Sequence, residues 1–221
     1  FRRVLFRSQN DDDDDHSVSL FVVQTDGEID VRQTIPLAEN TFCELVQDLD
    51  QDGSLDLVVT DNQTGTILIL MGRTDGAIAA PRRISVDSFA GAVVAGDFNS
   101  DGVTDLAVPC DHSICFVFGN PDRSFGGSST LSIPIDGDSP ADVVRADATG
   151  DGIDDLLVRS DSHQVYILQG DGHGGFVKHA VDDFSDRMTV KDIDGDGVPD
   201  ILVARHPEGI SLILQIGRAH V

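Results

Sequence analysis

Short apolar runs alternate along this chain with acidic loops that contain glycine. The runs are rich in Val, Ile and Leu and are too short for core helices, so they predict buried strands. Each acidic loop joins a first strand to a second; a third strand follows a polar turn, and a fourth follows a glycine-rich turn. The expected first strands are 44–46, 93–95, 143–144 and 188–190, the second 57–59, 106–108, 156–158 and 201–203, the third 67–70, 115–118, 165–168 and 210–214, and the fourth 84–86, 133–135 and 176–181.

The acidic loops recur at nearly constant intervals. Loop 1 (48–56), loop 2 (97–105), loop 3 (147–155) and loop 4 (192–200) start 49, 50 and 45 residues apart. Periods of roughly 40–50 residues with several short strands are typical of propeller blades. Pro81 and Pro134 lie in or beside the fourth strand, which suits an outer edge because proline cannot donate to a ladder. The sequence therefore predicts an all-β fold, an incomplete β-propeller arc of four-stranded blades.

The stretch before loop 1 fits the same register, because Asp15-His16-Ser17 precedes an apolar run as Asp111-His112-Ser113 does. The acidic run 11–15 is then either an inter-strand loop or a solvated linker. We expect a partial blade with its last two strands at 9–40, blades at 41–88, 89–137 and 138–183, and a partial blade with its first three strands at 184–215.

The two ends of the chain have a different expected origin. Residues 1–8 resemble the basic start of a signal peptide. However, with suitable codons, the coding sequence of 216–221 is the reverse complement of part of that for 1–8. We therefore interpret both segments as translated sequencing adapter, not native protein, and the rest as a gene fragment.

Each acidic loop has the oxygen donors of a calcium site. Oxygen-bearing side chains occupy positions 1, 3, 5 and 9, and glycine occupies position 6. Calcium takes six to eight oxygens, and glycine permits the sharp bend by adopting positive φ. An EF-hand loop would end in Glu at position 12, where this chain has Val each time, and a metal-free Asp-Gly turn would not need four oxygens. The expected ligands, with position 7 contributing its backbone carbonyl, are Asp48, Asp50, Asp52, Ser54 and Asp56; Asp97, Asn99, Asp101, Val103 and Asp105; Asp147, Thr149, Asp151, Ile153 and Asp155; and Asp192, Asp194, Asp196, Val198 and Asp200.

The number of carboxylates predicts an order of affinity among up to four bound Ca²⁺ ions. Loops 1 and 4 offer four carboxylates each, whereas loop 2 has Asn99 and loop 3 has Thr149 in place of one. Because ligand charge tunes calcium affinity, we expect loop 3 to lose its ion first.

The charge of the chain limits its partners. Fifteen basic residues face 39 acidic ones, for a net charge of −24, so nucleic acid is excluded as a partner because phosphate binding needs a basic face. Bound calcium would offset part of this charge, so folding and binding should be coupled. No apolar run reaches the roughly 18 residues of a transmembrane helix.

The cysteines and histidines add little chemistry of their own. Cys110 and Cys115 flank a four-residue stretch, so they form either a hairpin disulfide or two free thiols. Cys43 lies in an apolar strand and is expected to be a small core residue. His16, His112 and His163 fall at nearly equivalent inter-strand positions, which favours a structural or incidental role over catalysis.

With loop and period in place, the segment 89–108, FAGAVVAGDFNSDGVTDLAV, resembles the FG-GAP/VCBS repeat of integrin-α-type β-propellers. The resemblance covers nearly all of 17–215. It implies a Ca²⁺ ion in each acidic loop, a parent propeller of seven or eight blades, and a secreted or cell-surface location. The sequence departs from the repeat at the Gly-Ala-Pro element, where only Val108-Pro109 remains.

The expected function is a non-catalytic, calcium-binding module for adhesion or recognition of a protein or glycan outside the cell. Two alternatives are a fragment of a propeller-type polysaccharide lyase and a carbohydrate-binding lectin. A lyase needs a base and cationic groups that converge on substrate. A lectin usually needs aromatic platforms, and this chain has no Trp and one Tyr, Tyr166.

Overall fold

The computed structural model describes residues 3–9, 17–23, 26, 28–38, 41–87, 92–136, 138–184, 187–193, 195, 199–205 and 209–213. Within these residues every regular element is a β-strand, and no helix that could cross a membrane is found among them. The chain divides into two compact units, Phe1–Phe89 and Ala90–Val221.

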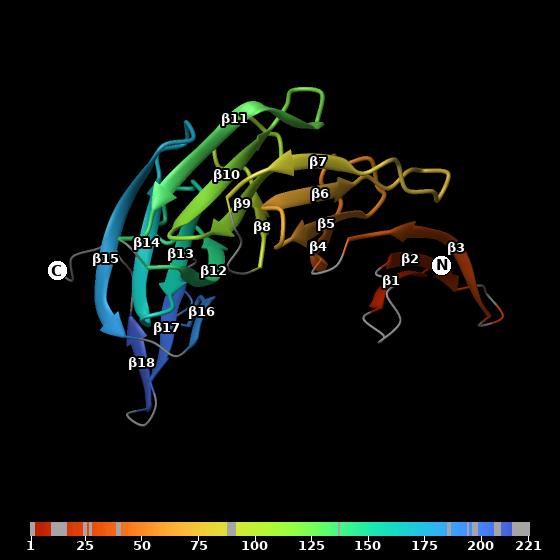
Figure 1. The fold of residues 1–221 in the computed structure, drawn as a ribbon. Helices are drawn as coiled ribbons and strands as arrows, with labels where there is room; N and C mark the ends of the chain where they lie inside the picture. Colours follow the sequence, from red (N-terminus) through yellow and green to blue (C-terminus); the bar gives the residue numbers. More distant parts are fainter. Residues whose placement is uncertain are drawn as a thin grey trace. The chain divides into compact units, whose positions relative to one another are not determined.

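The first unit contains two antiparallel sheets. One has the order β1-β2-β3, and the other has the order β4-β5-β6-β7 (Figure 1). The strands are β1 (Arg3–Gln9), β2 (Ser17–Val23), β3 (Ile29–Pro36), β4 (Thr41–Gln47), β5 (Asp56–Asp61), β6 (Thr66–Leu70) and β7 (Arg82–Ser85). Ile35 of β3 packs with Leu57, Leu68 and Ile78 in one buried cluster, so the two sheets share a core.

Strand β1 was not expected from the sequence. We expected the N-terminal sheet to have two strands, but Arg3–Gln9 pairs antiparallel with all seven residues of β2 and makes a third. The free edge of a sheet offers unpaired N–H and C=O groups to any extended segment, which gives a physical reason for this pairing. The pairing does not depend on where the coding sequence of residues 1–8 came from, so their origin in adapter stays a prediction.

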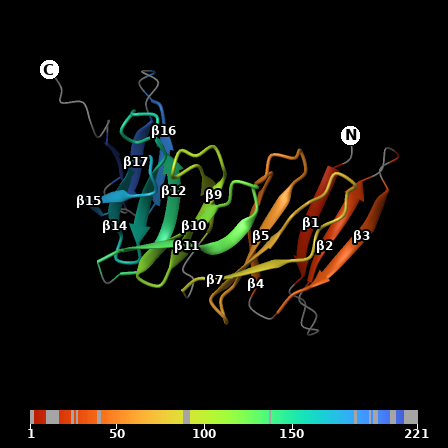
Figure 2. The same ribbon diagram turned by 90° about the horizontal axis from the view of Figure 1, so that it is seen from above.

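The second unit contains three antiparallel sheets, with orders β8-β9-β10-β11, β12-β13-β14-β15 and β16-β17-β18. Their strands are β8 (Val94–Gly96), β9 (Asp105–Cys110), β10 (Ser113–Gly119), β11 (Phe125–Pro134), β12 (Pro140–Ala146), β13 (Asp155–Ser160), β14 (Gln164–Gly170), β15 (Phe176–Phe184), β16 (Arg187–Lys191), β17 (Asp200–Arg205) and β18 (Gly209–Ile213). The first strands of these sheets lie beside one another, because β12 contacts both β8 and β16. β12 also contacts the second strand β9, and Figure 2 shows these two strands side by side.

Burial follows strand order in the way that the apolar runs predict. The second strands β5 and β9 are inner strands of their sheets and are buried along their whole length. Pro134 ends β11 at the edge of its sheet, and Pro81 directly precedes the edge strand β7, as expected from their missing N–H.

One core cluster of the second unit lies between the sheets β8–β11 and β12–β15. Phe98, Phe116, Val143 and Leu156 belong to one buried cluster to which both sheets contribute. Phe176 of β15 stacks on Phe116 of β10 with ring centroids 4.2 Å apart, which ties one sheet to the next. Consecutive sheets therefore pack face to face, and loops 2 and 3 lie at the ends of strands that this core holds in place.

Candidate metal centre

Each acidic loop connects the first and second strands of its sheet, and its position 9 is the first residue of the second strand. Two residues of each of loops 1 to 3 adopt positive φ. Position 6 does so in Gly53, Gly102 and Gly152, which confirms the role predicted for these glycines. Position 4 does so as well, with φ of 62° at Gln51 and 57° at Ser100. Gly150 and Gly195 adopt positive φ at position 4 of loops 3 and 4, so these glycines were a sequence signal for the second bend. Gln and Ser occupy the left-handed region only rarely, so loops 1 and 2 did not carry that signal.

Backbone N–H groups hold the carboxylates of loop 1 toward the inside of the bend. Asp48 accepts hydrogen bonds from the N–H of Asp52 at 3.1 Å and of Gly53 at 3.0 Å. Asp50 accepts a bond from Asp52 N–H at 3.1 Å, and Asp52 accepts one from Ser54 N–H at 2.7 Å. These bonds fix positions 1, 3 and 5 before any cation arrives.

Loops 2 and 3 repeat the same bonds. Asp97 accepts from Asp101 N–H and Gly102 N–H, as Asp147 does from Asp151 N–H and Gly152 N–H. The Nδ2 group of Asn99 also donates to Asp101 at 3.1 Å, a contact that a carboxylate at position 3 could not make. The repetition shows that one loop geometry is encoded three times.

The Asp at position 9 has a structural role that sequence analysis missed. The carboxylate of Asp105 accepts a bond from Phe98 N–H at 2.9 Å through one oxygen and from Gly119 N–H at 2.8 Å through the other. Equivalent pairs of bonds join Asp56 to Leu49 and Gly72, and Asp155 to Ala148 and Gly170. In loop 4, Asp200 accepts from Ile193 N–H at 2.9 Å. In loops 1 to 3, position 9 therefore braces its loop against the end of the third strand, besides being a predicted ligand.

The glycine after the third strand is the partner that this brace requires. A Cβ atom at Gly72 would lie 2.3 Å from the carbonyl oxygen of Leu55, and one at Gly119 would lie 2.4 Å from that of Thr104. Real Cβ atoms do not approach a carbonyl so closely, so only glycine fits. The recurrence of Gly72, Gly119 and Gly170 about one period apart was the available signal, although the sequence pattern predicted only turns at these residues.

Burial changes the acidity of the bracing carboxylates. Desolvation raises the pKa of Asp105 to about 6, and it raises the pKa of Asp56 and Asp155 as well. The hydrogen bonds from the backbone N–H groups oppose this rise but do not cancel it. A divalent cation beside such a carboxylate would favour its ionised form.

The donor set of loop 1 fits a hard cation. Asp48, Asp50 and Asp56 each present an oxygen within 4.8 Å of the others. Among the residues that the structure describes, no other three acidic, His or Cys side chains meet this spacing, and Asp52 stands outside the group. Alternate carboxylates around a tight bend are the ligands that Ca²⁺ prefers.

Loop 3 offers a second observation that fits a cation. The Oγ1 atom of Thr149, predicted as the ligand at position 3, is buried and has no hydrogen-bond partner. Buried hydroxyls normally have a partner, so a cation in the loop would supply a contact that the protein does not. In loop 4 only part of the expected set can be placed, since Asp194, Asp196 and Val198 lie outside the described residues.

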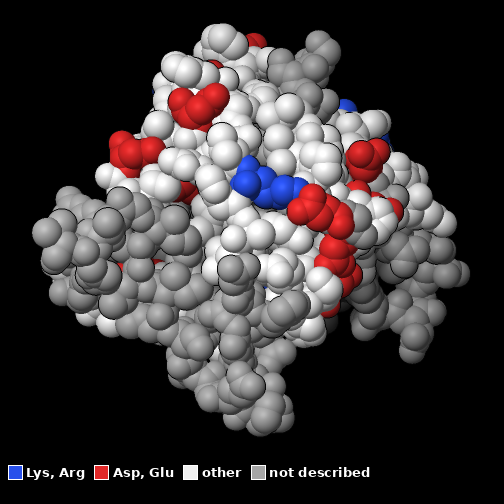
Figure 3. Space-filling view, turned by 90° about the vertical axis from the view of Figure 1, so that its left-hand side faces the viewer, with Lys and Arg blue, Asp and Glu red and all other residues white. Residues whose placement is uncertain are grey.

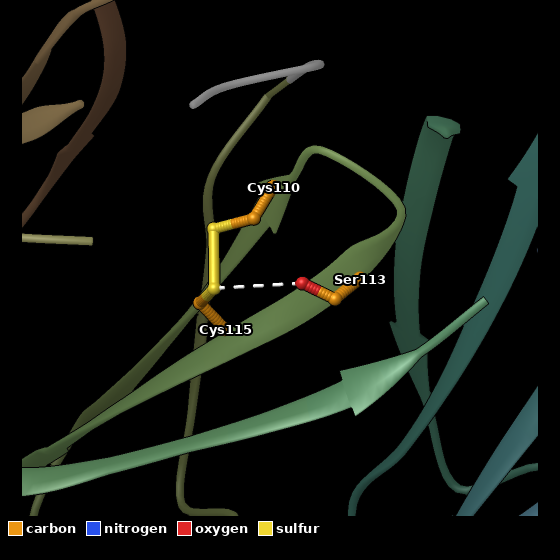
Figure 4. Close-up of a disulfide and its surroundings, with 3 residues drawn as sticks. All are labelled: Cys110, Ser113 and Cys115. Atoms are coloured by element: carbon orange, nitrogen blue, oxygen red, sulfur yellow. Dashed lines mark hydrogen bonds between the residues drawn. A yellow bond between two sulfur atoms is a disulfide. The ribbon is translucent and has the colours of Figure 1, made fainter. Parts of the chain in front are cut away.

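Two of the three cysteines form a disulfide. Cys110 at the end of β9 and Cys115 in β10 form a disulfide, with their Cα atoms 6.0 Å apart, which settles the alternative that the sequence left open. The Oγ atom of Ser113 lies 3.8 Å from the sulfur of Cys115. Figure 4 draws this contact as a dashed line. Cys43 lies in β4 as expected, but its side chain is outside the described part of the chain.

The placement of charge and of two histidines can be seen in the described part of the chain. On the face shown in Figure 3, acidic side chains are spread around a small basic area. His112 and His163 are exposed in equivalent turns, with φ of 56° and 69°. His16 and the acidic run 11–15 lie outside the described residues.

Comparison with known proteins supports the repeat. The FG-GAP-like repeat model matches residues 48–108 and 147–203, which together make up more than half of the chain. Each matched segment starts at an acidic loop, and the second continues through the loop 4 region. No curated protein matches the sequence significantly.

Solved structures show the same fold at low identity. A lectin of Agrocybe aegerita that recognises non-reducing terminal N-acetylglucosamine is 17% identical, with a TM-score of 0.64 over 98% of this chain and 60% of the lectin. The biofilm matrix protein Bap1 of V. cholerae is 17% identical, with a TM-score of 0.50 over 96% of this chain and 37% of Bap1. A protein from Lactobacillus plantarum is 12% identical, with a TM-score of 0.58 over 97% of this chain and 68% of that protein.

This chain spans less than two thirds of the lectin and of Bap1. At such identities the likeness concerns the fold, and it agrees with consecutive antiparallel sheets arranged as an incomplete propeller. The matched repeats, the strand order and the repeated loops lead to one conclusion: the chain belongs to the family of FG-GAP-like repeat proteins and has a β-propeller-type fold.

Proposed function

We propose that the chain is a calcium-binding, non-catalytic propeller module of a secreted or cell-surface protein, and that it serves adhesion or recognition of a protein or glycan ligand. The observation that carries this proposal is the repeated loop in which backbone N–H groups orient alternate carboxylates, together with the three converging oxygens of Asp48, Asp50 and Asp56. Such a donor set favours Ca²⁺ over softer or smaller ions.

Calcium would act on the fold more than on a reaction. Each loop gathers several carboxylates whose mutual repulsion opposes folding, and a divalent cation would convert that repulsion into attraction. Because position 9 is bonded to the end of the third strand, an ion in the loop would stabilise three strands at once. The ion would thereby fix the loops that a partner meets.

The expected location outside the cell has two supports. The disulfide Cys110–Cys115 suits an oxidising compartment. Extracellular calcium at millimolar concentration would fill sites with a Kd as weak as about 10⁻⁴–10⁻³ M. The proposed lack of a catalytic role is supported by the placement of His112 and His163 in separate, exposed inter-strand turns.

Thermal unfolding with and without calcium tests the proposal. A protein that lacks residues 1–8 and 216–221 should melt at a clearly higher temperature in 1 mM Ca²⁺ than in EDTA, by several degrees for each kcal/mol gained. Mg²⁺ at the same concentration is the control, and it should raise the melting temperature less because it demands a smaller, octahedral site. Identical melting in EDTA and in calcium would refute the proposal.

A further inference from the structure

A carboxylate of loop 3 holds the backbone of loop 2. Asp154, at position 8 of loop 3, accepts a hydrogen bond through Oδ2 from the backbone nitrogen of Asp97 at 3.2 Å. The same oxygen accepts a bond from Nη1 of Arg145, in β12, at 3.1 Å. The side chain of Asp154 is only 25% exposed, so water screens these contacts incompletely. Asp97 is the first predicted ligand of its loop.

The backbone next to Asp97 is shaped for this contact. β8 ends at Gly96, where an added Cβ would lie 2.7 Å from Cδ of Arg145 and 2.9 Å from Oδ2 of Asp154. Any side chain at Gly96 would displace the pair that holds Asp97. Loop 2 and its neighbour therefore fit together through a glycine.

A second contact joins the same two loops. The hairpin between β14 and β15 places Gly172 between them, because its Cβ would lie 3.3 Å from Oγ of Ser100 in loop 2 and 3.2 Å from Cδ1 of Ile153 in loop 3. Phe98 of loop 2 also packs edge-on against Phe176 in β15, with ring centroids 6.2 Å apart. Loop 2 thus rests on the sheet that carries loop 3.

From these contacts we propose that Asp154 is a positioning residue that couples the two metal loops, so that each binds calcium more tightly when the other is filled. The proposal rests on the proposed function, since it needs both loops to bind calcium. Asp154 lies between Ile153 and Asp155, two predicted ligands of loop 3, so closure of that loop around an ion moves or fixes the carboxylate that anchors Asp97. The coupling is particular to this junction, because the other loops have Leu55, Thr104 and Pro199 at position 8.

Site-resolved calcium titration by NMR tests the coupling. The amides of Gly102 and Gly152 each donate to the position 1 carboxylate of their own loop, so each reports on its own site. Asp154→Asn should raise the Kd at loop 2 about five- to tenfold. Asp151→Ala, which disables loop 3, should raise the Kd at loop 2 by a similar factor in the wild type and have little further effect in Asp154→Asn. By reciprocity, Asp101→Ala should weaken loop 3 by the same factor.

The control is Asp161→Asn, which removes the same charge from an exposed turn at the other end of β13. Coupling is overturned if Asp154→Asn binds like this control, or if Asp151→Ala weakens loop 2 equally with and without Asp154. If Asp154→Asn does not fold, Arg145→Gln can be used in its place, because it removes only the guanidinium that is hydrogen-bonded to Asp154. Arg145→Gln should also raise the Kd of loop 2. An unchanged Kd would contradict the coupling. If calcium shifts neither the Gly102 nor the Gly152 amide signal of the wild type, both the proposed function and the coupling are overturned.

Discussion

The Oδ1 atom of Asp56 accepts a hydrogen bond from the backbone nitrogen of Gly72 at 2.7 Å, although 16 positions separate the two residues. The bond joins an acidic loop to the end of the third strand, and it recurs between Asp105 and Gly119 and between Asp155 and Gly170. A close approach of two backbone segments is thus built into these three sheets, and it makes each loop sensitive to changes well outside it.

Gly72→Ala should destabilise the protein by about 1–3 kcal/mol, because its Cβ would overlap the carbonyl oxygen of Leu55. Gly76→Ala, in the same hairpin, is the matched control: its Cβ meets nothing within 4 Å, so it should lose only about 1 kcal/mol for its positive φ. Urea unfolding in EDTA measures both. Equal losses would show that the brace does not constrain position 72.

Asp105→Asn and Asp101→Asn should separate bracing from metal binding. In EDTA, Asp105→Asn should lose about 1–3 kcal/mol, since an amide can accept only one of the two N–H groups that the carboxylate serves. Asp101→Asn should cost little in EDTA, because Asp101 is exposed. Both should reduce the stabilisation gained from calcium. Denaturant titrations with EDTA and with calcium distinguish the two roles, and indistinguishable curves in EDTA would contradict them.

Acid should stabilise the calcium-free protein and destabilise the calcium-bound one. Burial raises the pKa of Asp105 to about 6 from an ordinary 3.8, so the folded state binds this proton more tightly than the unfolded state. Its contribution is fully present below pH 3.8 and is lost as the pH rises through about 6. Protons compete with calcium for the same oxygens, so acid should lower the stability of the protein when the ion is present.

Urea unfolding at pH 5 and pH 7 checks this prediction. Asp105→Asn is the control, and in EDTA it should reduce the difference in the free energy of unfolding between the two pH values. Asp138 does not interfere, because hydrogen bonds from Ser160 and Ser162 lower its pKa to about 2, well below this range. A calcium-free protein that is more stable at pH 7 than at pH 5 would contradict the expected sign.

Thr149→Asp should tighten calcium binding at loop 3 by about tenfold, because it adds a fourth carboxylate where Oγ1 now lacks a partner. Without calcium the same change should destabilise the protein through added repulsion. Asn99→Asp is the parallel variant in loop 2. It should raise the calcium affinity of its loop less, because the amide oxygen of Asn99 can already coordinate Ca²⁺. Calorimetric titration measures both, and a loop 3 that is the tightest site in the unaltered protein would contradict the predicted order.

The sequence by itself determined the features that depend on local geometry. The strand order around each loop, the positive φ of Gly53, Gly102 and Gly152, and the edge position of Pro134 follow from side-chain period, glycine conformation and the missing proline N–H. Such properties involve neighbours along the chain, so a repeated pattern suffices to predict them.

Tertiary structure decided the contacts that join distant segments. The disulfide required Cys110 and Cys115 to meet across two strands, the third strand β1 required the free edge of β2, and the bond from Asp97 to Asp154 required two sheets to pack. None of these has a local pattern, because each depends on which backbone segments the folded core brings within hydrogen-bonding distance. The same reason explains why Asp105 could be predicted as a ligand but not as a brace: its second partner, Gly119, reaches it only after the sheet has formed.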